Sequence, residues 1–305
     1  MKALITGVHG FVGKYLKEEL AGNGYEVVGT DLTGSDIVPA NFLDPESVAD
    51  LLRCVRPDVI FHLAGQASVA LSWKIPRKTF DINVGGTINL LETIHALSMS
   101  VKVLVVGSSD QYGNVRPKDC PIRETLELKP QSPYAISKEG QEKIALALAK
   151  MHHIPVVLTR SFNHIGPGQK KGFVLPDFAD SIVQIERNAH PAVLRVGNLE
   201  AERDFTDVRD VVRAYRMLIE KGKAGEVYNI GSGTSFPISH LLDELLKLTP
   251  AQVQVEPDPA RMRISDIPLI RCCYDKLRED TGWKPIYPLR QTLQDTLDYF
   301  RHAAE

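Results

Sequence analysis

The chain has 305 residues, and its 36 Lys and Arg against 38 Asp and Glu give a formal net charge of -2. Hydrophobic residues make up 43% and charged residues 24%, a balance typical of a globular protein with one large core or two modest ones. Such a charge balance predicts neither a nucleic-acid partner nor a membrane-binding surface. No apolar run is long enough for a signal sequence or a membrane span, so we expect a cytoplasmic protein.

Four cysteines are present, at Cys54, Cys120, Cys272 and Cys273. They form no CxxC pair and no Cys/His array with zinc spacing, so we expect no metal site. Structural thiols in a reducing compartment are the simplest interpretation.

Short β-rich runs alternate with helical patterns through about residue 160. Strands are expected over residues 3–6, 26–30, 59–63, 101–106 and 156–159, with a further strand ending near residue 44, and amphipathic helices over 11–20 and 88–97. Several strands are continuous apolar runs, typical of parallel strands covered on both faces. The alternation predicts an α/β fold with a Rossmann-type doubly wound parallel sheet and right-handed crossovers.

A glycine-rich turn follows the first expected strand and opens the first helix. Its spacing is GxxGxxG, from Gly7 through Gly10 to Gly13, with Phe11 and Val12 between the last two. Glycines allow the backbone to approach a pyrophosphate, and the helix N-terminus supplies N–H groups and a partial positive charge. The pattern predicts a dinucleotide site; a helix-capping turn without a ligand is the alternative.

The second expected strand ends at Asp31, 18 residues after Gly13. That offset suits a carboxylate that accepts the ribose hydroxyls of a dinucleotide. A carboxylate there repels a 2′-phosphate, and the Leu32-Thr33-Gly34-Ser35 segment offers no Lys or Arg to bind one. We therefore expect NAD(H) to be preferred, with NADP(H) possible as an alternative cofactor.

Further positions complete the expected cofactor site. Asp44 is either an adenine contact or a helix cap before Pro45, and the sequence favours neither. Leu63, Ala64 and Gly65 follow the strand over 59–63, where small residues let the chain pass close to a cofactor.

Two segments carry the expected chemistry. Ser108 ends the strand that begins near residue 101, and Ser132-Pro133 is a typical N-cap and first position of a helix. Tyr134 and Lys138 then lie one turn apart on one helix face. A free tyrosine has a pKa of about 10, and a nearby lysine cation and helix N-terminus favour phenolate, so we expect Lys138 to lower the pKa of Tyr134. Tyr134 is then the acid/base, and Ser108 donates a hydrogen bond to the same substrate oxygen.

Beyond residue 160 the alternation loosens, and helical patterns recur over 178–185, 211–219, 241–248 and 293–300. We expect a cofactor-binding domain formed by residues 1–161 with about 207–231, and a smaller α/β substrate-binding domain formed by 162–206 and 232–305. Ligands of such sheets bind at their carboxyl edge, which the second domain would cover.

Polar side chains in this second part suit a phosphorylated ligand. Asn163 follows a strand end, and Arg203 offers a planar fork for phosphate or ribose oxygens. Arg261 and Arg263 lie together in a Pro-bounded loop. Each arginine could equally form an ordinary surface salt bridge.

Over nearly its whole length the chain resembles the extended short-chain dehydrogenases/reductases, a family of nucleotide-sugar epimerases, dehydratases and reductases. The motifs that carry the resemblance are the TGxxGFxG start, the strand-end SSxxYG and YAISK. The resemblance implies a Ser108, Tyr134, Lys138 active site with NAD or NADP, and it implies that Asn83 on a central helix supports that site. An ordinary Asn beside a glycine turn is the alternative for Asn83. By analogy with the family, we expect a homodimer.

The segments FNHIGPGQ, RDFTDVRDV and DPARMRxSD are similar to those of the GDP-4-dehydro-6-deoxy-D-mannose reductases, which produce GDP-D-rhamnose. This similarity implies hydride transfer from NAD(P)H to the C4 keto group of a GDP-linked sugar. The substrate contacts that it implies are Ser109, Asp110, Asn163, Val174, Arg203, Arg263 and Asp266.

Three alternatives remain. In dehydratases of this family a Glu at the position of Asp110 removes the C5 proton, and the shorter Asp weakens a GDP-mannose 4,6-dehydratase interpretation without excluding it. An NDP-sugar 4-epimerase would share the same Ser, Tyr and Lys. A catalytically silent NAD sensor usually lacks the Tyr or the Lys, and both are present here.

Overall fold

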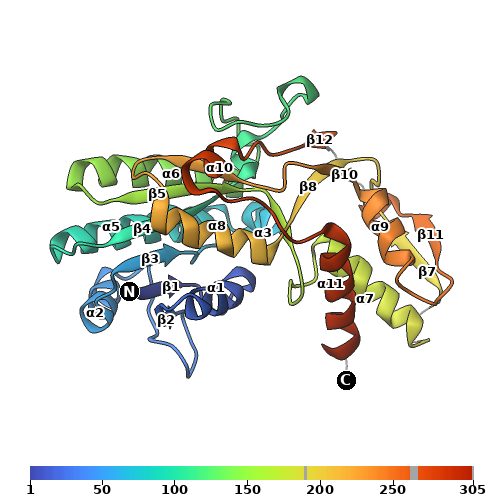
Figure 1. The fold of residues 1–305 in the computed structure, drawn as a ribbon, viewed down its shortest axis with the longest axis horizontal. Helices are drawn as coiled ribbons and strands as arrows, with labels where there is room; N and C mark the ends of the chain where they lie inside the picture. Colours follow the sequence, from blue (N-terminus) through green and yellow to red (C-terminus); the bar gives the residue numbers. More distant parts are fainter. Residues whose placement is uncertain (189–190, 262–266, 304–305) are drawn as a thin grey trace.

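A computed structural model describes residues 1–188, 191–261 and 267–303. Its main feature is a six-stranded sheet, all of whose neighbouring strands are parallel, in the order β2-β1-β3-β4-β5-β9 (Figure 1). The strands are β1 (Lys2–Thr6), β2 (Glu26–Thr30), β3 (Val59–His62), β4 (Lys102–Ser108), β5 (Val156–Ser161) and β9 (Val227–Ile230). The five main strands expected from the sequence and the Rossmann-type fold are confirmed.

Helices cover both faces of this sheet. Alternate residues of a strand point to opposite faces, so Ile5 packs against α1 (Phe11–Gly22) and α8 (Val208–Lys221). Leu4, its neighbour, packs with a separate cluster formed by α2 (Pro45–Val55), α5 (Gly86–Ala96) and α6 (Pro133–His152). Both strand residues are fully buried, and each such side chain contributes about 1.5–3 kcal/mol of hydrophobic stabilisation.

The strand expected to end near residue 44 is wrong. Asp44 is instead the N-cap of α2, where its side chain accepts a hydrogen bond from the Glu46 backbone N–H at 3.1 Å, and Pro45 takes the first helical position. Asp followed by Pro is a strong helix start, and it overrides the weak strand pattern before it. The sixth strand, β9, was not expected from the sequence.

From residue 69 to α5 the chain is almost entirely helical. It runs through α3 (Val69–Lys74), α4 (Pro76–Phe80) and a π-helical turn (Asp81–Gly85) into α5. Single π turns within helices often occur at functional sites.

The second part of the chain has its own core. Two small sheets form it: β6 (Asn163–Ile165), β10 (Ser235–Pro237) and β12 (Leu269–Ile270) all pair with β8 (Glu202–Asp207), and β7 (Val193–Val196) pairs with β11 (Gln254–Pro257). The helices α7 (Val174–Glu186), α9 (Ile238–Leu246) and α11 (Leu289–Ala303) pack around a third apolar cluster and contain the expected helical patterns. Figure 1 shows this part at one end of the large sheet, with α10 (Asp275–Thr281) returning over that sheet.

Short 3-10 turns complete the structure at Ser109–Tyr112, Pro117–Asp119 and Pro259–Arg261. Within the described part of the chain, no helix combines the length and the apolar character that crossing a membrane requires.

Candidate active site

The glycine turn lies where the strand order of the large sheet reverses. From β1 the chain first adds β2 on one side and then β3 on the other, and ligands of such sheets bind at a switch of this kind, at the carboxyl ends of the strands. Gly7 follows β1 with φ +71°, and a Cβ placed on it would lie 3.0 Å from the backbone nitrogen of Ala64, which follows β3. A Cβ on Gly13 would lie 2.6 Å from the carbonyl oxygens of Gly7 and Val8. Both positions therefore require glycine.

The first turn of α1 is free of a side-chain cap. Its N-cap residue is Gly10, whereas α2 and α6 are capped by the side chains of Asp44 and Ser132. Uncapped N–H groups and the positive end of the helix dipole suit an anionic group such as a pyrophosphate. Val12 packs into the core behind the turn, and the ring of Phe11 stacks at 6.1 Å on His164 from the second part of the chain.

Asp31 lies directly beside this turn. Its carboxylate accepts hydrogen bonds from the backbone N–H of Leu32 at 2.8 Å and of His9 at 3.3 Å. Lys17 and the His9 ring both contact Asp36, at 3.2 and 3.1 Å, and their hydrogen bonds hold the pKa of Asp36 below its usual value. Asp36 thus brings Lys17 together with His9 of the glycine turn, a contact that the spacing of the sequence did not reveal.

The Ser108 hydroxyl lies close enough to Tyr134 to lower the pKa of its phenol. Ser108 is the last residue of β4, and Tyr134 is the second residue of α6, which Ser132 caps by accepting from the Ala135 N–H at 3.1 Å. Tyr134 is only 8% exposed. The two segments predicted to carry chemistry thus meet at the carboxyl edge of the sheet.

The expected effect of Lys138 on Tyr134 is wrong for this structure. Burial raises the pKa of Tyr134 above its usual value, the Asp110 carboxylate raises it further, and the nearby Ser108 hydroxyl opposes them. Removing the Tyr134 phenol from water disfavours its ionised form, and this effect outweighs any stabilisation of that form by Lys138 on the same helix.

The Lys138 ammonium group donates elsewhere. It donates to the Val106 carbonyl at 2.8 Å and to Gln141 Oε1 at 2.9 Å, and burial lowers the pKa of Lys138 to about 8. A Cβ on Gly65 would lie 3.6 Å from its Nζ, so the lysine faces the turn after β3.

Asn83 joins that turn to α6. From the π-helical turn, its Nδ2 donates to the Gln66 carbonyl at 3.1 Å and to Ser137 Oγ at 2.8 Å, and its Oδ1 accepts from the Gln66 N–H at 2.8 Å. Asn83 is fully buried. It therefore fixes the cofactor-side turn against the helix that carries Tyr134 and Lys138.

A buried charged cluster lies behind Ser108, and the sequence did not predict it. Gln111 Oε1 accepts from the Ser108 backbone N–H at 2.9 Å, and Gln111 Nε2 donates to Glu142 at 2.8 Å. Arg160 donates to both oxygens of Glu142, at 2.9 and 2.6 Å, and both side chains are less than 10% exposed. The SxxQ spacing of a capping box was a visible signal, but the partner of a buried charge cannot be identified from sequence.

The predicted substrate residues fall into two groups. Ser109 and Asp110 form the turn after Ser108, and the Asp110 carboxylate is close enough to raise the pKa of Tyr134. Asn163 begins β6, Val174 begins α7 and Arg203 lies on β8. Arg203 donates to the carbonyl oxygens of Glu202 and Ile267 at 2.8 and 2.6 Å. Arg263 and Asp266 lie outside the described residues.

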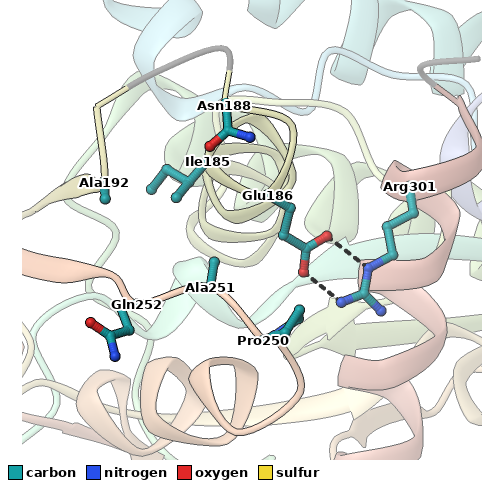
Figure 2. A pocket seen from close by; sticks show the side chains of 8 residues that line it. All are labelled: Ile185, Glu186, Asn188, Ala192, Pro250, Ala251, Gln252 and Arg301. Atoms are coloured by element: carbon teal, nitrogen blue, oxygen red, sulfur yellow. Dashed lines mark hydrogen bonds and ion pairs between the residues drawn. The ribbon is translucent and has the colours of Figure 1, made fainter.

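A separate hollow of about 620 Å³ lies in the second part of the chain (Figure 2). Its wall includes the ion pair between Glu186 of α7 and Arg301 of α11 at 2.6 Å. None of the predicted site residues lines it.

Comparisons with known proteins agree with this geometry. The family model described as GDP-mannose 4,6 dehydratase matches residues 4–296. A GDP-6-deoxy-D-mannose reductase of Pseudomonas aeruginosa is 36% identical over 300 residues, covering 97% of this chain and 96% of the relative. The solved structure of RMD from Pseudomonas aeruginosa complexed with NADPH is 34% identical, with a TM-score of 0.91 and 99% of each chain covered.

A UDP-glucose 4-epimerase of Thermus thermophilus, solved in complex with NAD, is 26% identical with a TM-score of 0.88, covering 99% of this chain and all of the other. Relatives with this fold have thus been solved with either nicotinamide cofactor. The chain belongs to the GDP-mannose 4,6-dehydratase family of extended short-chain dehydrogenases/reductases, which are NAD(P)-dependent enzymes acting on nucleotide sugars.

Proposed function

We propose that this chain reduces the C4 keto group of GDP-4-dehydro-6-deoxy-D-mannose with hydride from NAD(P)H, giving GDP-D-rhamnose. The observation that carries the proposal is that Ser108, at the end of β4, and Tyr134, in the first turn of α6, meet at the sheet edge, beside a turn built for a dinucleotide. The 36% identity to a GDP-6-deoxy-D-mannose reductase over almost the whole chain supports the choice of substrate.

The residues present fit a nicotinamide dinucleotide. The glycine turn leaves backbone N–H groups for the pyrophosphate, and the Asp31 carboxylate lies where ribose hydroxyls would be bound. Of the three N–H groups of Lys138, two have acceptors among the described residues, which leaves one for the nicotinamide ribose. When bound, the nicotinamide supplies the hydride. The residues we assign to its binding are Gly7, Gly10, Phe11, Val12, Gly13, Asp31, Leu32, Leu63, Ala64, Gly65, Asn83, Tyr134 and Lys138, while the cap of α2 accounts for Asp44.

The acid/base role of Tyr134 follows from its burial. Because its pKa is raised, the phenol keeps its proton at neutral pH, which is the form that a proton donor needs. With the C4 oxygen held between Ser108 and Tyr134, the proton passes from the phenol to that oxygen as hydride reaches C4. Ser108 stabilises the negative charge that develops on the oxygen.

We assign the sugar nucleotide to the second part of the chain. Ser109 and Asp110 form the turn after β4, with the Asp110 carboxylate near Tyr134, while Asn163, Val174 and Arg203 belong to elements of the second core. We accordingly propose a cofactor domain of residues 1–161 and about 207–231 and a substrate domain of 162–206 and 232–305. Leu277 and Trp283 of the substrate domain are buried in the core of the large sheet, which would tie the two together.

Three further assignments belong to the proposal. NADH is preferred over NADPH, because the Asp31 carboxylate repels a 2′-phosphate. The four cysteines are all free thiols, which suits the cytoplasm. A homodimer is assigned by family analogy, and the exposed Trp73 and Phe80 offer apolar surface for it.

Product analysis tests the proposal. The enzyme is incubated with GDP-4-dehydro-6-deoxy-D-mannose and NADH or NADPH, and separately with GDP-mannose and no reduced cofactor. Oxidation of the nicotinamide with formation of one GDP-6-deoxyhexose, and no reaction of GDP-mannose, is the expected result.

A 4,6-dehydratase is the second candidate, because the matching family model carries that description and Asp110 supplies a carboxylate beside Tyr134. Conversion of GDP-mannose to a 4-keto-6-deoxy product without added NAD(P)H would establish it in place of the reductase.

A further inference from the structure

A chain of buried polar side chains runs from Lys138 into the core of the large sheet. Lys138 Nζ donates to Gln141 Oε1 at 2.9 Å, and Gln141 Nε2 donates to Thr87 Oγ1 at 2.8 Å. His62 Nε2 lies 3.2 Å from the same Thr87 oxygen, and His62 Nδ1 lies 3.0 Å from Thr6 Oγ1. None of the five residues is more than 6% exposed, so water does not compete for these bonds.

The hydrogen positions in this chain follow from the partners of Thr87. A hydroxyl has one hydrogen, and that of Thr87 is donated to the Asn83 carbonyl at 2.8 Å. Thr87 Oγ1 can therefore only accept from its other neighbours. Gln141 meets it with its NH2 group, and His62 must meet it with a protonated Nε2.

The contacts of His62 Nδ1 also indicate that the proton of the ring is on Nε2. Thr6 Oγ1 accepts the backbone N–H of Ala64 at 2.9 Å, so its own hydrogen is available for His62 Nδ1. Nδ1 is then an acceptor, and the ring is the neutral Nε2–H tautomer. Full burial and the Lys138 charge lower the pKa of His62 to about 3, which agrees with an uncharged ring at neutral pH.

The direction of these bonds determines which end of the Gln141 amide faces the lysine. Because Thr87 accepts, the amide NH2 is directed to Thr87 and the amide oxygen is directed to Lys138. The Asn83 carbonyl keeps the Thr87 hydrogen, so Thr87 Oγ1 remains an acceptor, and the N–H that His62 donates to the same oxygen helps to hold that oxygen in place for the Gln141 NH2 group. Without the His62 donor, Thr87 Oγ1 loses one of the three bonds that fix it, and Gln141 is held less firmly with its oxygen on the ammonium.

We infer that His62 is a positioning residue: through Thr87 and Gln141 it holds an acceptor oxygen on the Lys138 ammonium, and through Thr6 it holds the turn at Ala64 that passes beside the glycine loop. The inference rests on the proposed function in one respect only, the use of Lys138 to bind the nicotinamide ribose. His62 is only 1% exposed at the end of β3, so we assign it an effect that passes through its neighbours.

The test compares two amide variants of His62. A Gln side chain can place its NH2 group near the position of Nε2 and donate to Thr87, whereas an Asn side chain reaches only the position of Nδ1. The measured quantity is the titration of Lys138 in protein labelled at lysine Cε, followed by NMR and assigned with Lys138→Arg. Without sugar or cofactor, His62→Asn is expected to lower the pKa of Lys138 below the wild-type value, and His62→Gln is expected to restore most of it.

Two further variants control the experiment. Gln141→Met removes the same acceptor oxygen by another route and is expected to shift the Lys138 titration as His62→Asn does, even if His62→Asn folds poorly. His95→Asn changes an exposed histidine on α5 and is expected to leave that titration unchanged.

Kinetics give the second measurement. His62→Asn is expected to raise the KM for NADH about tenfold, the scale of a hydrogen bond to a charged group, with a smaller change in kcat. A Lys138 titration that is the same in wild type, His62→Asn and Gln141→Met would overturn the inference, as would a wild-type His62 found by 15N NMR as the Nδ1–H tautomer or as the cation at neutral pH.

Failure of the proposed function gives a different result. If the 4-keto sugar is not reduced but Lys138 still titrates lower in His62→Asn, the positioning role stands and the substrate assignment fails.

Discussion

Replacing Glu142 by Gln tests the buried cluster behind Ser108. The substitution preserves the shape of the side chain but leaves the Arg160 guanidinium without its carboxylate, in a place where the arginine side chain is 7% exposed. Breaking a buried pair by removing one partner typically costs about 3–5 kcal/mol. At about 2.1 cal/mol/K of unfolding entropy per residue, a chain of 305 residues loses roughly 1.6 °C of Tm for each kcal/mol. We therefore expect Tm to fall by about 5–8 °C.

The assay is thermal unfolding followed by circular dichroism, with Glu46→Gln as the matched control. Glu46 also pairs with an arginine, Arg53 at 3.0 Å, but both side chains are more than half exposed, so the control is expected to leave Tm within experimental error. Turnover of Glu142→Gln is expected to fall too, because Gln111 loses a partner and no longer holds the Ser108 backbone as firmly. Equal Tm values for the two variants would refute the reasoning.

Four further predictions concern the candidate site. Tyr134→Phe is expected to reduce turnover by about 10²- to 10⁴-fold, measured as NADH oxidation, with NADH affinity by fluorescence titration nearly unchanged. Burial lowers the pKa of Lys138 to about 8, so the lysine is charged below that pH and neutral above it. Fluorescence titrations should therefore show that NADH binds more weakly as the pH rises through about 8. Asp31→Ser is expected to shift the ratio of NADPH to NADH kcat/KM towards NADPH by about tenfold, because a like-charge contact is removed; an unchanged ratio would contradict the assigned role. Gly13→Ala places a Cβ 2.6 Å from two carbonyl oxygens, and it should abolish NADH binding or lower stability by about 1–3 kcal/mol. Gly22→Ala on the same helix meets no atom within 4 Å, and it should raise stability by up to about 1 kcal/mol. The stability of each variant is measured by urea unfolding.

The large sheet could be predicted because its signals are local. A continuous apolar run, a glycine turn and an Asp or Ser cap each act within a few residues, so β1, α1 and the start of α6 were expected where they occur. Asp44 shows the limit of such reasoning, since one residue suited both a strand end and a helix cap. The pairing of β9 with β5 joins residues about 70 apart, and no local pattern indicates it.

In the candidate site, too, some features could be predicted from local sequence and others could not. Ser108, Tyr134 and Lys138 were identified from their spacing and from the family resemblance. The raised pKa of Tyr134 depends on burial, and the partners of Glu142 and His62 depend on which side chains the folded sheet brings together. Neither burial nor partner choice can be derived from a linear pattern, which explains why the direction of the Tyr134 pKa shift was wrongly expected.

The position of β9 means that the chain cannot be cut into two consecutive working pieces. β5 pairs with β9 from Leu158↔Val227 to Ser161↔Ile230, and the β6–α8 segment lies between them. During synthesis the first five strands leave the ribosome before the sixth, and until then β5 offers an open row of backbone donors and acceptors to other chains. A fragment ending near Ser161 should therefore aggregate, and permuted or split versions of the protein should retain the whole 156–230 stretch in one piece.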